Sequence, residues 1–133
     1  MLLGKSDPKS DVFDVLLYAS WNNHETLTIP SFVRIFESFA LNRCNVRKLE
    51  FLEDSCLEII ESKALDMSLL YSIQFPSSVR IVEESAFNCN HLLGTVTFQN
   101  NSKLEVIETG AFSECTFKTI TITPHVKTVC KFF

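Results

Sequence analysis

Short units of sequence recur along this chain every 22 to 25 residues. The dipeptide Ala86-Phe87 returns as Ala111-Phe112, and in weaker form as Ala40-Leu41 and Ala64-Leu65, so that successive alanines are 24, 22 and 25 residues apart. A unit of this length cannot bury a hydrophobic face alone, and neighbouring units must stack to build a continuous core. The period therefore predicts a solenoid.

Each unit contains two β-type segments. The first alternates apolar, polar and apolar residues, which is the pattern of a half-buried strand. The second is a short apolar segment with one charged residue, and we expect a bend after the charge because two apolar residues follow it in four units. An Ala-Phe type pair comes next and is expected to form one helical turn. The first segments centre on Leu27 and Ile29, Leu49 and Phe51, Ile73 and Phe75, Val96 and Phe98, and Ile120 and Ile122, and the second segments are 33–36, 57–60, 79–82, 104–107 and 126–129.

The connection between the two strands has two forms. In three units a proline, Pro30, Pro76 or Pro124, follows the first strand, and its missing N–H ends the strand there. In the other two units the polar segments 52–56 and 99–103 predict longer turns.

These patterns predict the fold class and the domain organisation. We expect an α/β leucine-rich-repeat solenoid of about five repeats, with short parallel strands and short helical turns. Residues 1–23 are expected to be a lead-in and cap, in which residues 12–21 seal the first repeat, and residues 24–133 to hold the repeats. The last repeat stops before its Ala-Phe position, so we expect it to be incomplete, with an open end that favours self-association.

Stacked parallel strands place equivalent residues in columns, so the spacing of the repeats alone predicts a binding face. The outward positions of the first strands are rich in threonine and carry little charge, so we expect them to bind a protein or a glycan partner. Three larger side chains precede these strands. The predicted face consists of Thr28, Glu50, Gln74, Thr97 and Thr121, of Thr26, Lys48, Ser72, Thr95 and Thr119, and of Arg47, Tyr71 and Lys118.

The charged position of the second strand alternates in sign from unit to unit. Its members are Arg34, Glu58, Arg80, Glu105 and Lys127. Stacking would place opposite charges above and below each one, which predicts a ladder of ion pairs that helps to fix the register. Each exposed pair is worth only about 0 to 1 kcal/mol.

Charge and cysteine spacing exclude several classes of protein. The net charge of −4 and the pI near 5.3 argue against a nucleic-acid partner. No segment has the length of a membrane span, and the first residues lack the apolar core of a signal peptide. The cysteines form no C-x-x-C pair and no loop has calcium-ligand spacing, so we expect no metal and no other cofactor. Cys44, Cys89 and Cys115 follow the Ala-Phe positions and are expected to be buried thiols, with disulfides as the alternative.

The recurring residues resemble a known family. Ile29-Pro30 and Phe75-Pro76, together with Glu-Ser-Ala-Phe-Asn-Cys at 84–89 and Gly-Ala-Phe-Ser-Glu-Cys at 110–115, resemble the BspA-like, or Treponema pallidum-type, leucine-rich repeat over about residues 24–129. With Ser-Asp-Pro at 6–8, the sequence is similar to the versions found in trichomonad and amoeboid protists. The resemblance implies a surface or secreted antigen implicated in adhesion to host cells, matrix proteins or other microbes.

Three functions compete at this point. The first is an adhesin-type module at the cell surface or outside the cell, as the resemblance implies. The second is an intracellular interaction scaffold, favoured by the missing signal, the missing anchor and the unpatterned cysteines. The third is a hydrolase that uses Cys130 with His125, which we disfavour because the spacing suggests no third, orienting group. We therefore predict a binding module that is not an enzyme, and we leave its compartment open.

Overall fold

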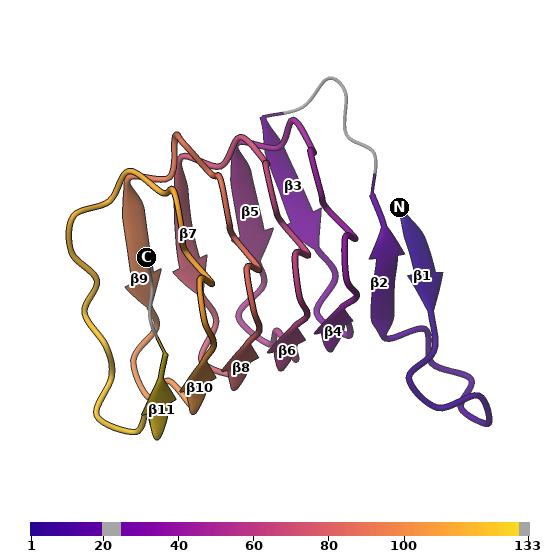
Figure 1. Ribbon diagram of the computed structural model, residues 1–133. Helices are drawn as coiled ribbons and strands as arrows, with labels where there is room; N and C mark the ends of the chain where they lie inside the picture. Colours follow the sequence, from indigo (N-terminus) through magenta and orange to yellow (C-terminus); the bar gives the residue numbers. More distant parts are fainter. Residues whose placement is uncertain (20–24, 131–133) are drawn as a thin grey trace.

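The computed structural model describes residues 1–19 and 25–130, whose strands form two sheets along a solenoid (Figure 1). The four-stranded sheet, here called the first sheet, has the order β3-β5-β7-β9, and the seven-stranded second sheet has the order β1-β2-β4-β6-β8-β10-β11. The strands are β1 (Leu2–Gly4), β2 (Val15–Tyr18), β3 (Thr26–Ile29), β4 (Ile35–Phe36), β5 (Lys48–Phe51), β6 (Ile59–Ile60), β7 (Ser72–Phe75), β8 (Ile81–Val82), β9 (Thr95–Phe98), β10 (Val106–Ile107) and β11 (Thr128–Val129).

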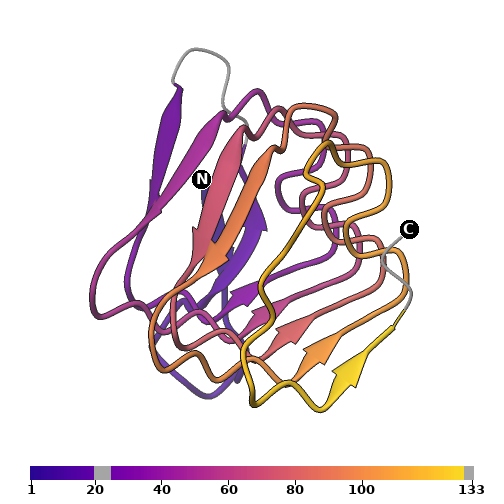
Figure 2. The same ribbon diagram turned by 90° about the vertical axis from the view of Figure 1, so that its left-hand side faces the viewer.

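The chain winds through about five coils, as the period predicts. We number them coil 1 (residues 26–47), coil 2 (48–71), coil 3 (72–94), coil 4 (95–118) and coil 5 (119–130). The strands of successive coils pair in parallel within both sheets. The view along the stack shows the two sheets meeting at an angle, with the corners on a third side (Figure 2).

The second sheet bends at its charged residue, as predicted. The N–H groups of Glu58 and Ile59 both donate to the carbonyl of Arg34 in the previous coil, at 2.8 and 3.2 Å. Successive N–H groups of a straight strand would point to opposite neighbours, so the backbone must turn there. The same pair of contacts recurs at 34–35, 80–81, 105–106 and 127–128. In coils 1 to 4 the bend leaves the first apolar residue half-buried and buries the second completely.

The corner that carries each Ala-Phe type pair is not helical, and the predicted helical turn is wrong. The described part of the chain contains no helix. Ala64 N–H donates to Glu61 within its own coil, whereas Leu65 N–H donates to Ala86 of the next coil at 2.8 Å. A helix would direct every N–H to the residue four positions earlier in the same segment. Here alternate N–H groups hold neighbouring coils together instead.

Left-handed backbone conformations explain how the corner avoids a helix. Every complete corner has two residues with positive φ, one near its start and one near its end. A residue in this region breaks the run of right-handed angles that a helix requires. The pairs are Phe39 and Arg43, Lys63 and Met67, Ser85 and Cys89, and Gly110 and Glu114.

Aromatic side chains fill the interior in stacks that run along the solenoid. Phe87 and Phe112 occupy the same position in successive corners, and their ring centroids are 5.1 Å apart with an interplanar angle of 14°. Phe75 and Phe98 stack in the same way at 5.2 Å and 17°. Phe75 meets Phe87 edge to face at 5.5 Å, which joins the two stacks. The repeated phenylalanines therefore tie coil 3 to coil 4 through the core.

The N-terminal segment adds two strands to the second sheet. β2 pairs in parallel with β4 in the register Val15 to Ile35 and Leu16 to Phe36, and β1 pairs antiparallel with β2. Leu16 is fully buried in the common core. The boundary at residue 23 stays a prediction, and residues 20–24, which include the end of the predicted sealing segment 12–21, lie outside the described residues.

Candidate functional site

The outward side chains of β3, β5, β7 and β9 form one continuous polar face. Their inward neighbours Leu27, Leu49, Ile73 and Val96 are buried, so strand alternation turns the polar residues to solvent. The pairing places the predicted residues in columns. Thr26, Lys48, Ser72 and Thr95 form one column, and Thr28 with Glu50 and Gln74 with Thr97 form the rungs of the other.

A groove of about 540 Å³ opens on this face. Its lining comes from the centre of the predicted face and from the turns that follow β5 and β9. The groove residues are Lys48, Leu49, Glu50, Phe51, Leu52, Ser72, Ile73, Gln74, Thr95, Thr97 and Gln99. The sequence placed most of these polar residues on the surface but offered no sign that they line a hollow.

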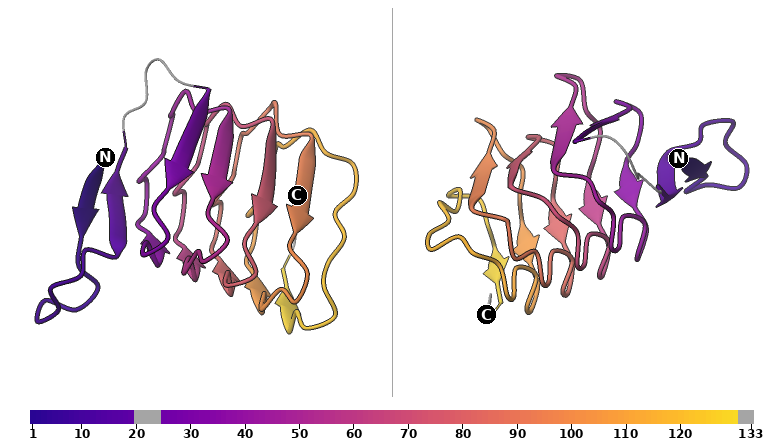
Figure 3. Two further views of the ribbon diagram at one scale, coloured as in Figure 1. Left: turned by 180° about the vertical axis from the view of Figure 1, so that it is seen from behind. Right: turned by 90° about the horizontal axis from the view of Figure 1, so that it is seen from above.

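The groove follows the junction between β5 and β7, which we call the seam. Lys48 and Ser72 are the single residue pair that joins the two strands, whereas four pairs join β3 to β5 and four join β7 to β9. Beyond that pair, Leu49–Phe51 and Ile73–Phe75 do not pair with each other. The turn after β5 projects away from the other turns on its side of the stack (Figure 3, right). The first sheet is therefore partly open at its centre.

Charge within the groove is neutralised locally. Lys48 Nζ lies 3.0 Å from Glu50 Oε1, and Thr28 Oγ1 lies 3.5 Å from the other Glu50 oxygen. Within the described chain, Ser72, Gln74, Thr95 and Thr97 have no side-chain hydrogen bond. The groove thus offers hydroxyl and amide groups that remain available to a ligand.

An exposed aromatic residue stands beside the groove. The Tyr71 ring lies 5.3 Å from the Arg47 guanidinium carbon, in a cation–π arrangement, and Arg47 is 3.5 Å from Glu25. The tyrosine side chain is 45% exposed. The equivalent position of coil 3 is Gly94, around which a Cβ would meet almost nothing, so the next coil presents no side chain at the position that Tyr71 occupies in coil 2.

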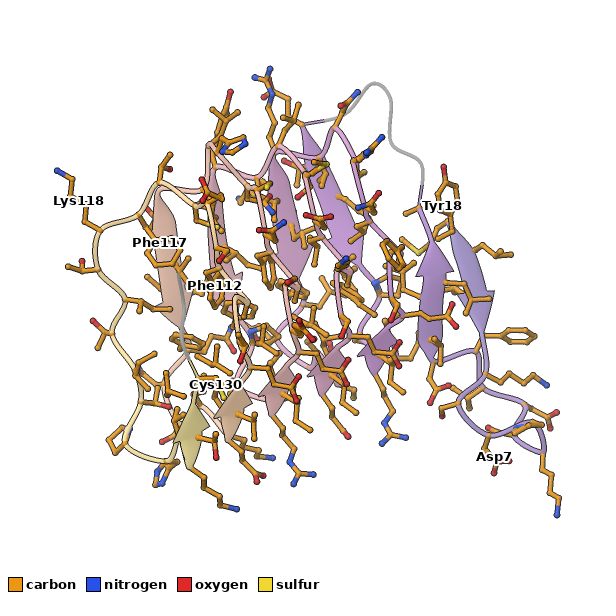
Figure 4. The ribbon with its side chains drawn as sticks, viewed as in Figure 1. Asp7, Tyr18, Phe112, Phe117, Lys118 and Cys130 are labelled. Atoms are coloured by element: carbon orange, nitrogen blue, oxygen red, sulfur yellow. The ribbon has the colours of Figure 1, made fainter. Side chains whose placement is uncertain are left out.

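Three of the predicted residues do not join this face. The expected strand around Ile120 and Ile122 does not form, and the chain curves away from β9 before it reaches β11 (Figure 1). Lys118, Thr119 and Thr121 are exposed on this curved segment. Lys118 points away from the molecule, while Phe117 and Phe112 point into the interior (Figure 4).

The charge ladder of the second sheet is confirmed in part. Arg34 lies 3.1 Å from Glu58, Arg80 lies 2.7 Å from Glu105, and Lys127 lies 2.9 Å from Glu105. Hydrogen bonds from Lys127 and Arg80 hold the pKa of Glu105 below its ordinary value. No ion pair joins Glu58 to Arg80, two described residues that belong to the coils on either side of the seam.

The first rung of the ladder was not predicted from the sequence. Asp14 is buried and lies 3.6 Å from Arg34. Burial alone would raise the pKa of Asp14, but hydrogen bonds from the Ser6 hydroxyl and backbone N–H, together with the charge of Arg34, hold the pKa below its ordinary value. The sequence feature that could have revealed it is the segment Asp14-Val15-Leu16, which repeats the charged and apolar residues of the later second strands.

Comparison with known proteins identifies the family. A family model described as a BspA type leucine rich repeat region matches residues 16–132 in six copies. The chain belongs to the BspA-type leucine-rich repeat family. No curated protein sequence matches the chain.

A solved structure supports the assignment to the BspA-type family. The crystal structure of the pneumococcal vaccine antigen PcpA is similar to 80% of this chain, with a TM-score of 0.78 and 32% sequence identity. The chain spans about a quarter of that protein, since the match covers 26% of its length. The predicted resemblance is thus confirmed at the level of the family, and the suggested protist origin stays a prediction.

One interior column of these BspA-type repeats differs from the prediction. Cys44, Ser68, Asn90 and Cys115 occupy the same position in successive corners, and Cys89 lies one position before it. Ser68 Oγ donates to Asn90 Oδ1 at 2.6 Å, and Asn90 Nδ2 donates to the carbonyl of Leu65 at 2.7 Å. Cys44 is buried as predicted, whereas Cys89 and Cys115 are half-buried. Burial raises the pKa of the Cys115 thiol to about 12.

The described residues of this BspA-type chain show few features of reaction chemistry. No hydrogen bond joins the exposed His125 to the half-buried Cys130. No cluster of three or more metal-ligating side chains occurs in residues 1–19 and 25–130. Nor does any helix in that part of the chain have the length and hydropathy needed to cross a bilayer.

Proposed function

We propose that the chain is a non-catalytic module that binds a protein or a glycan through the outer face of the first sheet. The observation that carries this proposal is the groove of about 540 Å³, which collects hydroxyl and amide groups without hydrogen-bond partners of their own. A polar group that has no internal partner can bond to a ligand without first breaking an existing contact. Solenoid proteins commonly bind macromolecules on the extended surfaces that stacking creates.

The proposed setting is the cell surface or the space outside it, with a role in attachment to host cells or matrix. Two observations support it. The chain belongs to the BspA-type family, whose resemblance led us to expect surface or secreted antigens, and the similar solved structure is that of a vaccine antigen. The predicted self-association through the open end stays a prediction that sedimentation of the purified chain can test.

A pair of charge insertions tests the binding face. Replacing Gln74 and Thr97 with lysine should abolish binding to immobilised matrix proteins and to a glycan array, because two long cations would then occupy the groove. The matched control replaces Thr109 and Thr128 with lysine, since both are exposed, one on the corner and one on the second sheet. The control adds the same charge and should bind like the wild type. Binding that survives the Gln74→Lys and Thr97→Lys changes would place the site elsewhere.

An intracellular interaction scaffold is the second candidate. It is favoured by the thiols, since Cys56, Cys89, Cys115 and Cys130 form no disulfide and unpaired thiols persist in reducing compartments. A tag on the chain in intact cells separates the two candidates. Digestion by added protease supports the surface role, and full protection supports the scaffold.

A further inference from the structure

We propose that the seam between β5 and β7 binds an extended strand of a partner protein, which pairs through its backbone with the facing edges of both strands. This inference rests on the proposed function, because it names one class of partner for the same face. Recognition by strand addition takes its affinity from main-chain hydrogen bonds and its specificity from alternate side chains.

Among the described residues, the seam is the one junction between neighbouring strands of the first sheet that has unpaired edges, although the outer edges of β3 and β9 also pair with no strand of this sheet. β3 and β5 share four residue pairs, as do β7 and β9, so each of these junctions is closed along its length. At the seam the pairing stops after Lys48 and Ser72. Beyond that pair, Leu49–Phe51 and Ile73–Phe75 have no strand partner across the seam, and all of them except Phe75 line the groove. Backbone N–H and C=O groups require partners, and a peptide backbone supplies both at the right spacing.

The length of the turns explains why the sheet opens there. Five residues connect the two strands of coils 1 and 3, whereas seven residues connect them in coils 2 and 4; in coil 5, five residues separate Ile122 from the start of β11. The seam lies where a long-turn coil precedes a short-turn coil. The same order, a long turn followed by a short one, recurs from coil 4 to coil 5, and there segment 119–122 does not pair with β9. In contrast, each short-turn coil pairs fully with the long-turn coil that follows it.

The lining of the seam favours an uncharged, β-branched strand. Lys48 and Glu50 neutralise each other at 3.0 Å, so the groove offers little to attract a charged residue. Half-buried Phe51 and exposed Leu52 provide apolar surface, while Gln74 and Thr97 provide hydrogen-bonding groups. Alternate side chains of a threonine- and valine-rich strand would meet these two surfaces in turn.

Hydrogen exchange of the free protein tests the open edges without any ligand. The backbone amides that face the seam in 49–51 and 73–75 should exchange about tenfold or more faster than those between β3 and β5, because they lack a ladder partner. Equal protection at all three junctions of the first sheet would overturn the proposal.

A library of random seven-residue peptides displayed on phage provides the probe. Peptides selected on the wild-type protein should be uncharged and β-branched, and their binding should protect the amides of 49–51 and 73–75. Methylating alternate backbone nitrogens of a selected peptide should weaken its binding about tenfold or more, since each methyl group removes a donor. Selection of no peptide, or protection of other residues, would contradict binding in the seam.

Deleting Glu53 and Asp54 gives coil 2 the short connection of its neighbours and should close the seam. We expect this variant to lose peptide binding and to gain protection at 73–75. The matched control deletes Asn100 and Asn101 from the other long turn and should retain peptide binding. If the variant that lacks Glu53 and Asp54 does not fold, hydrogen exchange of the wild type with bound peptide still shows whether the peptide lies in the seam. Peptides that protect β3 or β9 instead would overturn binding in the seam but leave the proposed function intact. The proposed function is overturned separately, if matrix and glycan binding survives the Gln74→Lys and Thr97→Lys changes.

Discussion

Burial sets the chemistry of single residues in this chain. Asp14 is the buried carboxylate at the end of the charge ladder, and its pKa is lowered because Ser6 and Arg34 outweigh the cost of burial. Cys115 is the half-buried thiol whose pKa rises to about 12, while Cys56 is exposed in the long turn of coil 2. The pKa values of Asp14 and Cys115 therefore move in opposite directions, and each can be tested separately.

Asp14 should make stability depend on pH. Because its pKa is lower in the folded chain than its ordinary value of 3.8, its contribution is complete above that value and is lost as the pH falls through the folded pKa. Asp14→Asn should lower the free energy of unfolding by about 1 to 3 kcal/mol at neutral pH. The difference from the wild type, measured by urea denaturation, should shrink at acidic pH. A constant difference would show that ionisation of Asp14 does not stabilise the fold.

The cysteines should react with a thiol reagent in a fixed order. The thiolate is the reactive form, so iodoacetamide at about pH 8 should modify the exposed Cys56 well before the half-buried Cys115 in the folded protein. Peptide mass spectrometry at successive times measures the order, and urea-unfolded protein serves as the control in which the difference disappears. Early modification of Cys115 would contradict its burial and its hydrogen bond to the carbonyl of Phe87 at 3.2 Å.

At the scale of elements, the conformation of the corner is the feature that was predicted wrongly from the sequence. An Ala-Phe pair with polar neighbours is compatible with a helical turn, and local propensity cannot reveal that Leu65 N–H serves the next coil. The strands were predictable because their alternation is local. The failure of a fifth strand to form in the first sheet was not predictable. The segment containing Ile120 and Ile122 has the same alternating pattern as β3, but its pairing depends on the length of the turn in the coil before it.

The left-handed positions of the corner predict a difference in stability between a glycine and an alanine variant. Glu114 is exposed with φ of 58°, and the residue at the other left-handed position of that corner is Gly110. Glu114→Gly should unfold with a free energy about 1 kcal/mol higher than Glu114→Ala, because the methyl group of alanine is strained at positive φ. Both variants remove the same charge, so thermal unfolding of the pair isolates the backbone effect. Equal stability would show that the corner accommodates a Cβ without strain.

At the scale of the whole molecule, the ladder and the turns share one pattern. Coils with short turns carry a cation at the bend, and coils with long turns carry a carboxylate. The alternating signs could be predicted from the sequence because the charge positions recur within each period. The missing ion pair between Glu58 and Arg80 could not be predicted, since it depends on how the side chains of coils 2 and 3 are placed across the seam.

Reversing one rung tests the ladder. Arg80→Glu replaces the attraction to Glu105 with repulsion and should lower the melting temperature by a few degrees in low salt. The loss should be smaller at about 1 M salt, where exposed charges are screened. Arg43→Glu is the matched control, because Arg43 is exposed and forms no ion pair with the described residues. If the melting temperature falls as much in the control, or if the fall does not depend on salt, the ladder does not contribute to the stability of the fold.

The alternation of long and short turns also restricts how such an array can change its length. Removal of coil 2 alone would place Arg34 beside Arg80 and set two short turns next to each other. Removal of coils 2 and 3 together would instead place Arg34 beside Glu105 and keep a short turn before a long one. Adding or removing coils in even numbers would therefore preserve both the alternation of charge and the alternation of turn length, whereas an odd number would interrupt both.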